Sequence, residues 1–284
     1  MSFKDYTQRV NQHLDGYLSS TGSLTEAMRY SVLSGGKRFR PILTYAVANT
    51  FGTDLDLVDS SACAVELIHA YSLIHDDLPA MDDDDMRHNQ PACHKKFGEA
   101  QAILAGDGLQ ALAFEILTND DGLSTQVRID LLQSLTHSAF KMAEGQSIDL
   151  SVVSKIIDIK TLKNIHRKKT GSLLSCSVRL GALVSSQCLT EDHEILNGFA
   201  QDIGLAYQVQ DDVLDVLTPE GLLGKNQYSD VDKNKPTYPA LLGLDKATKT
   251  YQQLYQQAFK KLEKLSVDAN ELRNLTEQLQ SRKF

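Results

Sequence analysis

The sequence predicts an all-α protein. Apolar residues recur at steps of three and four along most of the chain, a spacing that places them on one face of a helix. Two-residue alternation bounded by turn residues, which marks a strand, does not stand out in any segment. Glycine and proline number 17 and 6 among 284 residues, which is too few for a turn-rich all-β protein.

The predicted helices follow one another from end to end. In the first, one face carries Phe3, Tyr6, Val10, Leu14 and Tyr17. Further helices are predicted over residues 24–34, 38–51, 58–78, 99–118, 124–146, 161–185, 191–217 and 236–245. Near the C-terminus the same pattern runs from Tyr251 to Leu265 and from Leu272 to Leu279, with a break at residues 266–268.

Two segments are apolar on nearly all sides, residues 62–74 and 101–117. Helices without a polar face belong in the middle of a bundle. The sequence contains no fixed-period repeat, no low-complexity stretch and no linker rich in glycine, serine or proline. We therefore predict one helical domain over residues 1–284.

Composition excludes several classes of protein. The chain carries 37 acidic and 29 basic residues, and a net charge of −8 argues against nucleic-acid binding. The sequence has no run of 18 consecutive apolar residues, so we predict no membrane span. The first residues lack the pattern of a signal peptide. Scattered cysteines do not predict disulfides or a zinc site, so we expect a reducing, cytoplasmic location. They are Cys63, Cys93, Cys176 and Cys188.

An acidic segment, HDDLPAMDDDDMR at residues 75–87, holds six aspartates within ten positions. A solvated acidic loop is one interpretation. The segment directly follows a predicted buried helix, however, and like charges packed this closely call for a counter-charge. An EF-hand is excluded, because counting from Asp82 puts Arg87 where that loop needs glycine and Cys93 where it needs glutamate. Magnesium shared between carboxylates and substrate phosphates fits better.

A second acidic group lies in YQVQDDVLD, residues 207–215. Asp211 and Asp215 are four residues apart, and Gln208 precedes Asp211 by three, so the three share one helix face. Two such clusters on separate helices can hold metal between them. In the metal-free protein, we expect removal of Asp76 or Asp211 to relieve repulsion.

Basic residues form three groups suited to phosphate. Lys37 and Arg40 follow the Gly35-Gly36 pair one helical turn apart, although a basic helix start is the alternative. Residues 166–174 contain Lys168, Lys169 and Thr170, and residues 223–236 contain Lys225, Lys233 and Lys235. His69 lies seven residues before Asp76, nearly in line with it on one helix, where a core histidine is the alternative.

These parts suit an apolar ligand with a diphosphate head. Metal-assisted departure of diphosphate from an allylic carbon is the reaction that such a site favours, because metal neutralises the leaving group and a dry pocket shelters a carbocation.

At this point the motifs carry a resemblance that extends over essentially the whole chain. GGKRFRP resembles the GGKR-x-RP motif of the polyprenyl synthase (trans-isoprenyl diphosphate synthase) family, and HDDLPAMDDDDMR resembles its first aspartate-rich motif in the DDxxxxD form. The family's remaining segments resemble, in order, AILAGDGL, GQSIDL, HRKKTGSL, YQVQDDVLD, and LGK followed by DKNKPTYP. The resemblance is closest to the bacterial members that make a C15 product.

The resemblance implies an isoprenoid synthase fold, a bundle of antiparallel helices around a central apolar cavity. It implies condensation of isopentenyl diphosphate with dimethylallyl or geranyl diphosphate to farnesyl diphosphate, by ionisation, condensation and elimination. It also implies a homodimer and a Mg²⁺ cofactor, with three ions in each active site and Mn²⁺ as a substitute.

The resemblance also assigns roles to individual positions. Metal would be bound by Asp76, Asp82 and Asp211, with Asp77, Asp212 and Asp215 in support. Isopentenyl diphosphate would be held by Lys37, Arg40 and His69, and by His88 if it replaces a family arginine. The allylic diphosphate would be held by Arg87, Lys169 and Lys225, with Lys235 closing over it. Thr170 and Gln208 would turn their dipoles toward the developing cation.

Chain length would be set on the helix that ends at the first motif. Tyr71, five residues before Asp76, would form a floor and Ser72 would lie beside it. In the family, an aromatic residue here, or the two-residue insertion seen as Pro79-Ala80, accompanies a C15 stop, although Tyr71 could instead be ordinary core packing.

Three departures from the family pattern and three alternative functions remain. The chain has Arg87-His88-Asn89 where the family has Arg-Arg-Gly, Tyr207 where it has phenylalanine, and Asn234 where bacterial members often have glycine. A geranylgeranyl diphosphate synthase shares the same motifs. A terpene cyclase would not need GGKRFRP, and an inactive synthase subunit would have lost the aspartate motifs.

Overall fold

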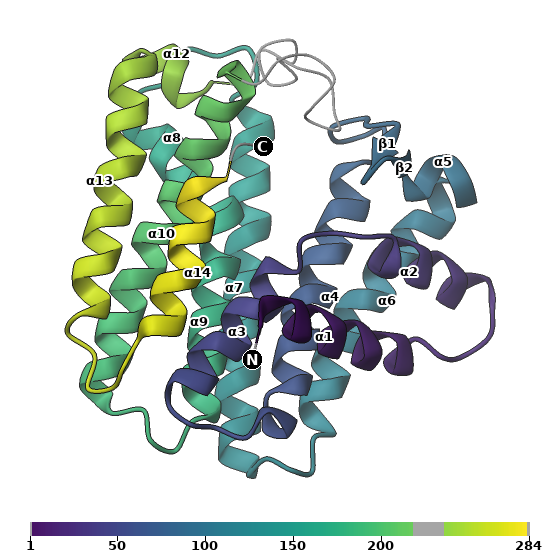
Figure 1. Cartoon of the computed structure of the whole chain (residues 1–284). Coiled ribbons are helices and arrows are strands. Elements are labelled where there is room, and N and C mark those ends of the chain that lie inside the picture. The colour runs from purple at the N-terminus through teal and green to yellow at the C-terminus, as the bar shows by residue number, and fades with distance from the viewer. Residues whose placement is uncertain (1, 218–235, 283–284) are drawn as a thin grey trace. The chain divides into compact units, whose positions relative to one another are not determined.

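The computed structural model describes residues 2–217 and 236–282 (Figure 1). Within these ranges the all-α prediction is confirmed, because helices account for nearly all regular structure and one two-stranded hairpin is the exception. None of the described helices is long and apolar enough to cross a membrane.

The chain divides into two compact units. The first comprises Met1–Leu135 and Leu180–Ser186, and the second comprises Thr136–Arg179 and Gln187–Phe284. Helices α7 (Thr125–Ser151) and α9 (Ser172–Val184) have residues in both units. The single-domain hypothesis stays a prediction.

The first unit is built from helices, a short 3₁₀ turn and the hairpin. Its elements are α1 (Phe3–Tyr17), α2 (Ser23–Leu33), α3 (Phe39–Thr50), η1 (Leu55–Leu57), α4 (Asp59–Asp76), β1 (Met86–Arg87), β2 (Gln90–Pro91), α5 (Cys93–Phe97) and α6 (Glu99–Thr118). The helices lie close to the predicted ranges. The sequence did not predict the hairpin or α5, because each is shorter than the periods that reveal a strand or a helix.

Helix α4 forms the centre of the first unit and packs against α6 and α3. Twelve of its 18 residues are buried, as its all-round apolar sequence predicts. Burying a side chain such as Leu67 or Ile68, both fully buried, contributes about 1.5–3 kcal/mol. The prediction for α6 is only partly right, because Ile103 and Leu104 are 44% and 52% exposed.

The second unit contains the remaining helices. They are α8 (Ile159–His166), η2 (Arg167–Gly171), α10 (Thr190–Leu217), α12 (Tyr238–Leu242), α13 (Leu244–Leu262) and α14 (Asn270–Ser281). Figure 1 shows α10 and α13 side by side, and a core cluster that includes Val209, Val213 and Tyr238 fills the space around them. The helix predicted up to residue 245 ends earlier, because Gly243 takes a φ of 82° and α13 starts directly after it.

The helix predicted over 161–185 is interrupted by η2, one turn of π-helix. A Cβ atom on Gly145 would lie 2.3 Å from the backbone nitrogen of Lys169, so α7 and this turn are in direct backbone contact. The apolar spacing on either side of the turn is helical, which is why the sequence did not reveal it. Single π-turns are frequent at functional sites.

Candidate active site

The first acidic motif folds back on itself at the end of α4. The backbone nitrogen of Asp82 donates to the carbonyl of Asp76 at 2.9 Å, and that of Leu78 donates to His75 at 3.2 Å. The turn that includes Pro79-Ala80 is thereby closed, and the two predicted metal ligands of this motif, Asp76 and Asp82, are joined by a backbone hydrogen bond.

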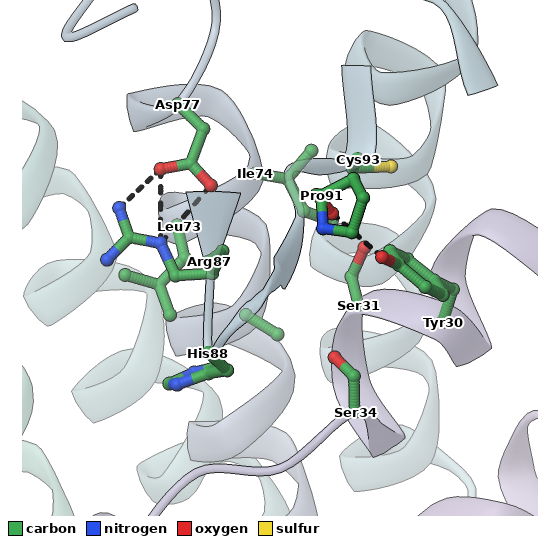
Figure 2. A pocket seen from close by; sticks show the side chains of 11 residues that line it. Tyr30, Ser31, Ser34, Leu73, Ile74, Asp77, Arg87, His88, Pro91 and Cys93 are labelled. Carbon is green, nitrogen blue, oxygen red and sulfur yellow. Dashed lines mark hydrogen bonds and ion pairs between the residues drawn. The ribbon is translucent and has the colours of Figure 1, made fainter. Parts of the chain in front are cut away.

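Asp77 holds an arginine instead of facing solvent. The Arg87 Nε donates to both carboxylate oxygens, at 3.1 and 3.2 Å, and Nη2 donates to Oδ1 (Figure 2). Burial raises the pKa of Asp77, while the arginine opposes that shift. Asp84 lies 3.7 Å from the same guanidinium. This forked contact orients Arg87, which is predicted to bind the allylic diphosphate.

Several basic side chains of the first unit lie near His69. The pKa of His69 falls well below 6.5, first because its surroundings are desolvated and then because Arg40, His88 and Arg87 are nearby. The imidazole is therefore neutral at neutral pH and can donate one hydrogen bond. The structure thus brings together Arg40, His69 and His88 of the predicted acceptor group and Arg87 of the predicted allylic group.

The glycine motif and the hairpin meet although about 50 residues separate them in sequence. A Cβ atom on Gly36 would lie 3.8 Å from Nε2 of His88, and one on Gly35 would lie 3.9 Å from Cβ of His88. Lys37, between these glycines and α3, is exposed. The turn of the hairpin therefore lies next to Gly35 and Gly36, whose φ values of 126° and 103° favour glycine.

Arg38 anchors that motif and was not predicted. It is 6% exposed, pairs with buried Glu66 at 2.9 Å, and donates to the carbonyl of Val32 at 2.6 Å. Its φ of 50° is left-handed and immediately precedes α3. The sequence placed Arg38 among the basic residues of GGKRFRP without distinguishing this structural arginine from Lys37 and Arg40.

A pocket lies in the first unit beside the hairpin. Figure 2 shows Arg87 and His88 on its wall, with Leu73 and Ile74 from α4. On α4, Tyr71 is half-buried, contacts the ring of His75 edge-on and shares a hydrogen bond with Gln110 of α6. Burial raises its pKa. The hydroxyl of Ser72 donates to the carbonyl of His69 at 2.8 Å.

In the second unit, the π-turn places Lys169 against α7. Its ammonium donates to Asp149 of the GQSIDL motif at 2.8 Å, and Lys168 lies 3.4 Å from Glu144. Thr170 follows in the same turn and is half-buried. These carboxylates balance the charge of Lys169, which is predicted to bind the allylic diphosphate, and of Lys168 next to it.

The second acidic motif lies on α10, and its Asp211 forms an ion pair with the side chain of Arg282. Nη1 of Arg282 contacts Asp211 Oδ1 at 2.7 Å, and its guanidinium lies 3.8 Å from the centre of the Tyr207 ring. Gln208 donates to the other oxygen of Asp211 at 3.4 Å. Asp211 therefore binds positive charge in this structure, which fits a role as a metal ligand.

The other two aspartates of the motif are buried. Asp212 interacts with His166 at 3.2 Å and accepts from the backbone nitrogen of Tyr238 at 2.9 Å, which joins α10 to α8 and α12. Asp215 is 4% exposed. Lys225, Lys233, Asn234 and Lys235 lie outside the described residues.

The described residues of each unit therefore include carboxylates of the kind that bind Mg²⁺ and cations of the kind that bind diphosphate. Asp76 with Asp82, and Asp211 separately, offer the oxygen ligands that Mg²⁺ prefers alongside substrate phosphates. A sequence profile described as polyprenyl synthetase matches residues 21–275. The chain belongs to this family.

Relatives within the family have prenyltransferase names. The farnesyl diphosphate synthase of Haemophilus influenzae is 46% identical over 282 residues, covering 97% of this chain and 95% of its own. The geranylgeranyl pyrophosphate synthase of Capsicum annuum is 43% identical over 244 residues, covering 84% and 65%. This polyprenyl synthetase family member is accordingly a prenyltransferase that acts on prenyl diphosphates.

Solved structures agree with the family assignment. A crystal structure of a putative farnesyl-diphosphate synthase from Marinomonas has a TM-score of 0.85 at 43% identity, covering 98% of this chain and 97% of that one. Geranyltransferase from Helicobacter pylori, complexed with magnesium and isoprenyl diphosphate, has a TM-score of 0.87 at 31% identity, covering 98% and 96%. The family is Mg²⁺-dependent.

Within this family, the His88-Asn89 departure has a structural basis. These two residues form the tight turn between β1 and β2, with φ values of 50° and 60°. Asparagine and histidine are enriched at such left-handed positions, so the pair suits a turn in which the family pattern has arginine and glycine. Burial, together with Arg87 and Arg38, lowers the pKa of His88 below 6.5.

Proposed function

We propose that this prenyltransferase condenses isopentenyl diphosphate with dimethylallyl and then geranyl diphosphate and releases farnesyl diphosphate. The observation that carries the proposal is the position of Tyr71 on α4, five residues before Asp76 and in contact with Gln110 of α6. That separation corresponds to about 7 Å along a helix, so an aromatic ring there can limit how far a chain extends from the head group.

We assign the acceptor diphosphate to Lys37, Arg40, His69 and His88, and the allylic diphosphate to Arg87, Lys169, Lys225 and Lys235. In the reaction, the allylic carbon–oxygen bond breaks, the double bond of isopentenyl diphosphate supplies the electrons of the new carbon–carbon bond, and a proton leaves the acceptor. We expect the departed diphosphate to take that proton, so no protein base is required. Thr170 and Gln208 direct their dipoles toward the cation.

Metal would be held by Asp76, Asp82 and Asp211. When bound, Mg²⁺ neutralises the charge that develops on the leaving diphosphate. We propose three ions per site, with Mn²⁺ able to substitute. Arg87 is oriented by Asp77, and Lys169 by Asp149, so both cations are positioned before substrate arrives.

We also propose a homodimer in the cytoplasm. Ile103 and Leu104 on α6 expose apolar side chains that a second copy can cover. The four free cysteines, of which Cys63, Cys93 and Cys176 are buried, are typical of a reducing compartment. Replacing Leu104 with glutamate is expected to shift the mass measured by light scattering from two chains to one.

The test is to incubate purified protein with Mg²⁺, isopentenyl diphosphate and either dimethylallyl or geranyl diphosphate, and to size the products. We expect a C15 product, no turnover in excess EDTA, and no turnover from an Asp211→Asn control. The second candidate is a geranylgeranyl diphosphate synthase, which the similarity to the Capsicum annuum enzyme favours. A dominant C20 product would establish that alternative, and full activity in EDTA would refute the metal mechanism.

A further inference from the structure

Asp83, Asp85 and His94 form a cluster in the first unit that the proposed reaction does not use. Each contributes one potential metal-ligand atom, and the three atoms lie within 4.8 Å of one another. None of the three was assigned to Mg²⁺ or to diphosphate. The two aspartates follow Asp82 in the chain, whereas His94 lies in the first turn of α5.

The hairpin brings these residues together. Its pairing continues one step beyond the strands, because the backbone nitrogen of Ala92 donates to the carbonyl of Asp85 at 2.8 Å. Asp85 is therefore held opposite Ala92, two residues before His94. Asp83 has a φ of 51°, and its nitrogen donates to the carbonyl of Leu78 at 3.2 Å, which fixes the backbone on the other side of the cluster.

His94 is the observation that points to a ligand. The residue is only 6% exposed, and neither Nδ1 nor Nε2 of its ring has a hydrogen-bond partner. A buried polar group without a partner destabilises the fold, because it has lost its hydrogen bonds to water and gained none in the protein. A neutral imidazole carries a lone pair on one nitrogen, and binding a metal would satisfy that nitrogen.

We propose that Asp83, Asp85 and His94 form a second cation site, selective for a divalent transition ion of the Zn²⁺ class over Mg²⁺. Imidazole is a ligand for Zn²⁺, whereas Mg²⁺ prefers oxygen ligands and retains its waters. Bonds of about 2.0–2.2 Å place neighbouring ligand atoms roughly 3.0–3.5 Å apart. Asp83 and Asp85 are exposed, so rotation of their side chains can close the remaining gap.

Lys95 does not prevent binding at this site. Its ammonium lies 2.7 Å from Asp85, but the two side chains are 43% and 73% exposed. Such a surface ion pair is weak because solvent screens it, so a divalent ion displaces the lysine. Once bound, the ion connects the segment after Asp82 to α5 and restrains the hairpin that carries Arg87.

The test separates this site from the predicted magnesium ligands. Zn²⁺ binding is measured by calorimetry on the full chain carrying Asp76→Asn and Asp211→Asn, in a large excess of Mg²⁺. We expect one equivalent to bind, and we expect His94→Asn, Asp83→Asn and Asp85→Asn each to weaken it by about tenfold or more. Asp83 is exposed, so its variant remains informative if His94→Asn fails to fold.

Matched controls are His137→Asn and Asp121→Asn, which replace an exposed histidine and a 99% exposed aspartate side chain. Both are expected to retain the parent affinity. Spectra of ¹⁵N-labelled imidazole groups should show one histidine nitrogen shifting on Zn²⁺ addition, and that signal should be missing from His94→Asn. No Zn²⁺ binding to the parent protein, equal competition by Mg²⁺, or affinity unchanged in the Asp83 and Asp85 variants would overturn the proposal.

Discussion

Replacing Arg282 with methionine should destabilise the metal-free protein more than the metal-bound protein. The guanidinium contacts Asp211 at 2.7 Å and donates to the carbonyl of Tyr207 at 2.7 Å and to Gln210 Oε1 at 3.1 Å. The Arg282 side chain is 11% exposed and that of Asp211 is 42% exposed. The arginine is thus the counter-charge of the second acidic motif within the second unit.

The expected cost follows from those contacts. The ion pair to half-exposed Asp211 contributes at most about 1 kcal/mol because solvent screens it. The Tyr207 carbonyl and the Gln210 amide lose a charged donor, at about 1–3 kcal/mol for a buried acceptor. Contact with the Tyr207 ring adds about 0.5–1 kcal/mol. These terms overlap, so we expect a loss of about 2–4 kcal/mol in the free energy of unfolding.

The assay is urea unfolding with and without Mg²⁺ and inorganic pyrophosphate. A bound cation at Asp211 takes over part of the role of the arginine, so the difference between Arg282→Met and parent should shrink by about half or more. Arg273→Met is the control: Arg273 lies on α14, which ends just before Arg282, and its partner Glu263 is exposed, so the change should cost less than about 1 kcal/mol. An equal loss in both variants, or a difference unaffected by Mg²⁺ and pyrophosphate, would refute the reasoning.

Three further predictions concern substrates. The pKa of His88 lies below 6.5, so the protonated form that binds diphosphate is lost as pH rises through this pKa. In steady-state kinetics, the Michaelis constant for isopentenyl diphosphate should therefore rise with pH, and His88→Arg should flatten that dependence on pH. Arg87→Lys loses the forked contact with Asp77 and should raise the Michaelis constant for the allylic substrate about tenfold, with an unchanged constant contradicting that role. Tyr71→Ala should extend the product to C20 or beyond in chromatographic sizing, with Gln110→Ala as the control for loss of their hydrogen bond alone; a folded, active variant that still stops at C15 would exclude Tyr71 as the floor.

Arg282 also changes an expectation drawn from the sequence. The clustering of aspartates predicts that removing Asp211 relieves repulsion in the metal-free protein. The structure gives the opposite expectation, because removal would leave the buried guanidinium of Arg282 without its carboxylate. About 70 residues separate the two, and spacing rules connect residues only along one helix or one turn. The sequence therefore could not reveal this pair.

Periodicity was most informative where most of a helix is buried. The all-round apolar character of residues 62–74 correctly placed α4 in the core, because burial on every side leaves no polar stripe. The same argument was wrong for part of α6, where Ile103 and Leu104 are exposed. An apolar residue can be buried by its own chain or by another molecule. The sequence is the same in both cases, so composition alone cannot distinguish a core position from an exposed contact position.

For the candidate site, local spacing identified residue types but not their partners. Asp76, Asp82 and Arg87 lie within one short segment, and the turn that joins them follows from the inserted residues. The position of His88 next to Gly35 and Gly36 depends on how the hairpin packs in the first unit. Such tertiary contacts carry no periodic signal.

The close approach of Gly145 to the backbone of Lys169 limits which relatives can share the lysine-bearing turn of this protein. Any side chain there would meet the backbone of Lys169, and a backbone atom cannot rotate away as a side chain can. A relative with alanine or a larger residue at the aligned position must displace either its long helix or the turn that holds the lysine. The product length and metal requirement measured for such a relative therefore apply to this protein only if the structure of that relative shows the same lysine-bearing turn.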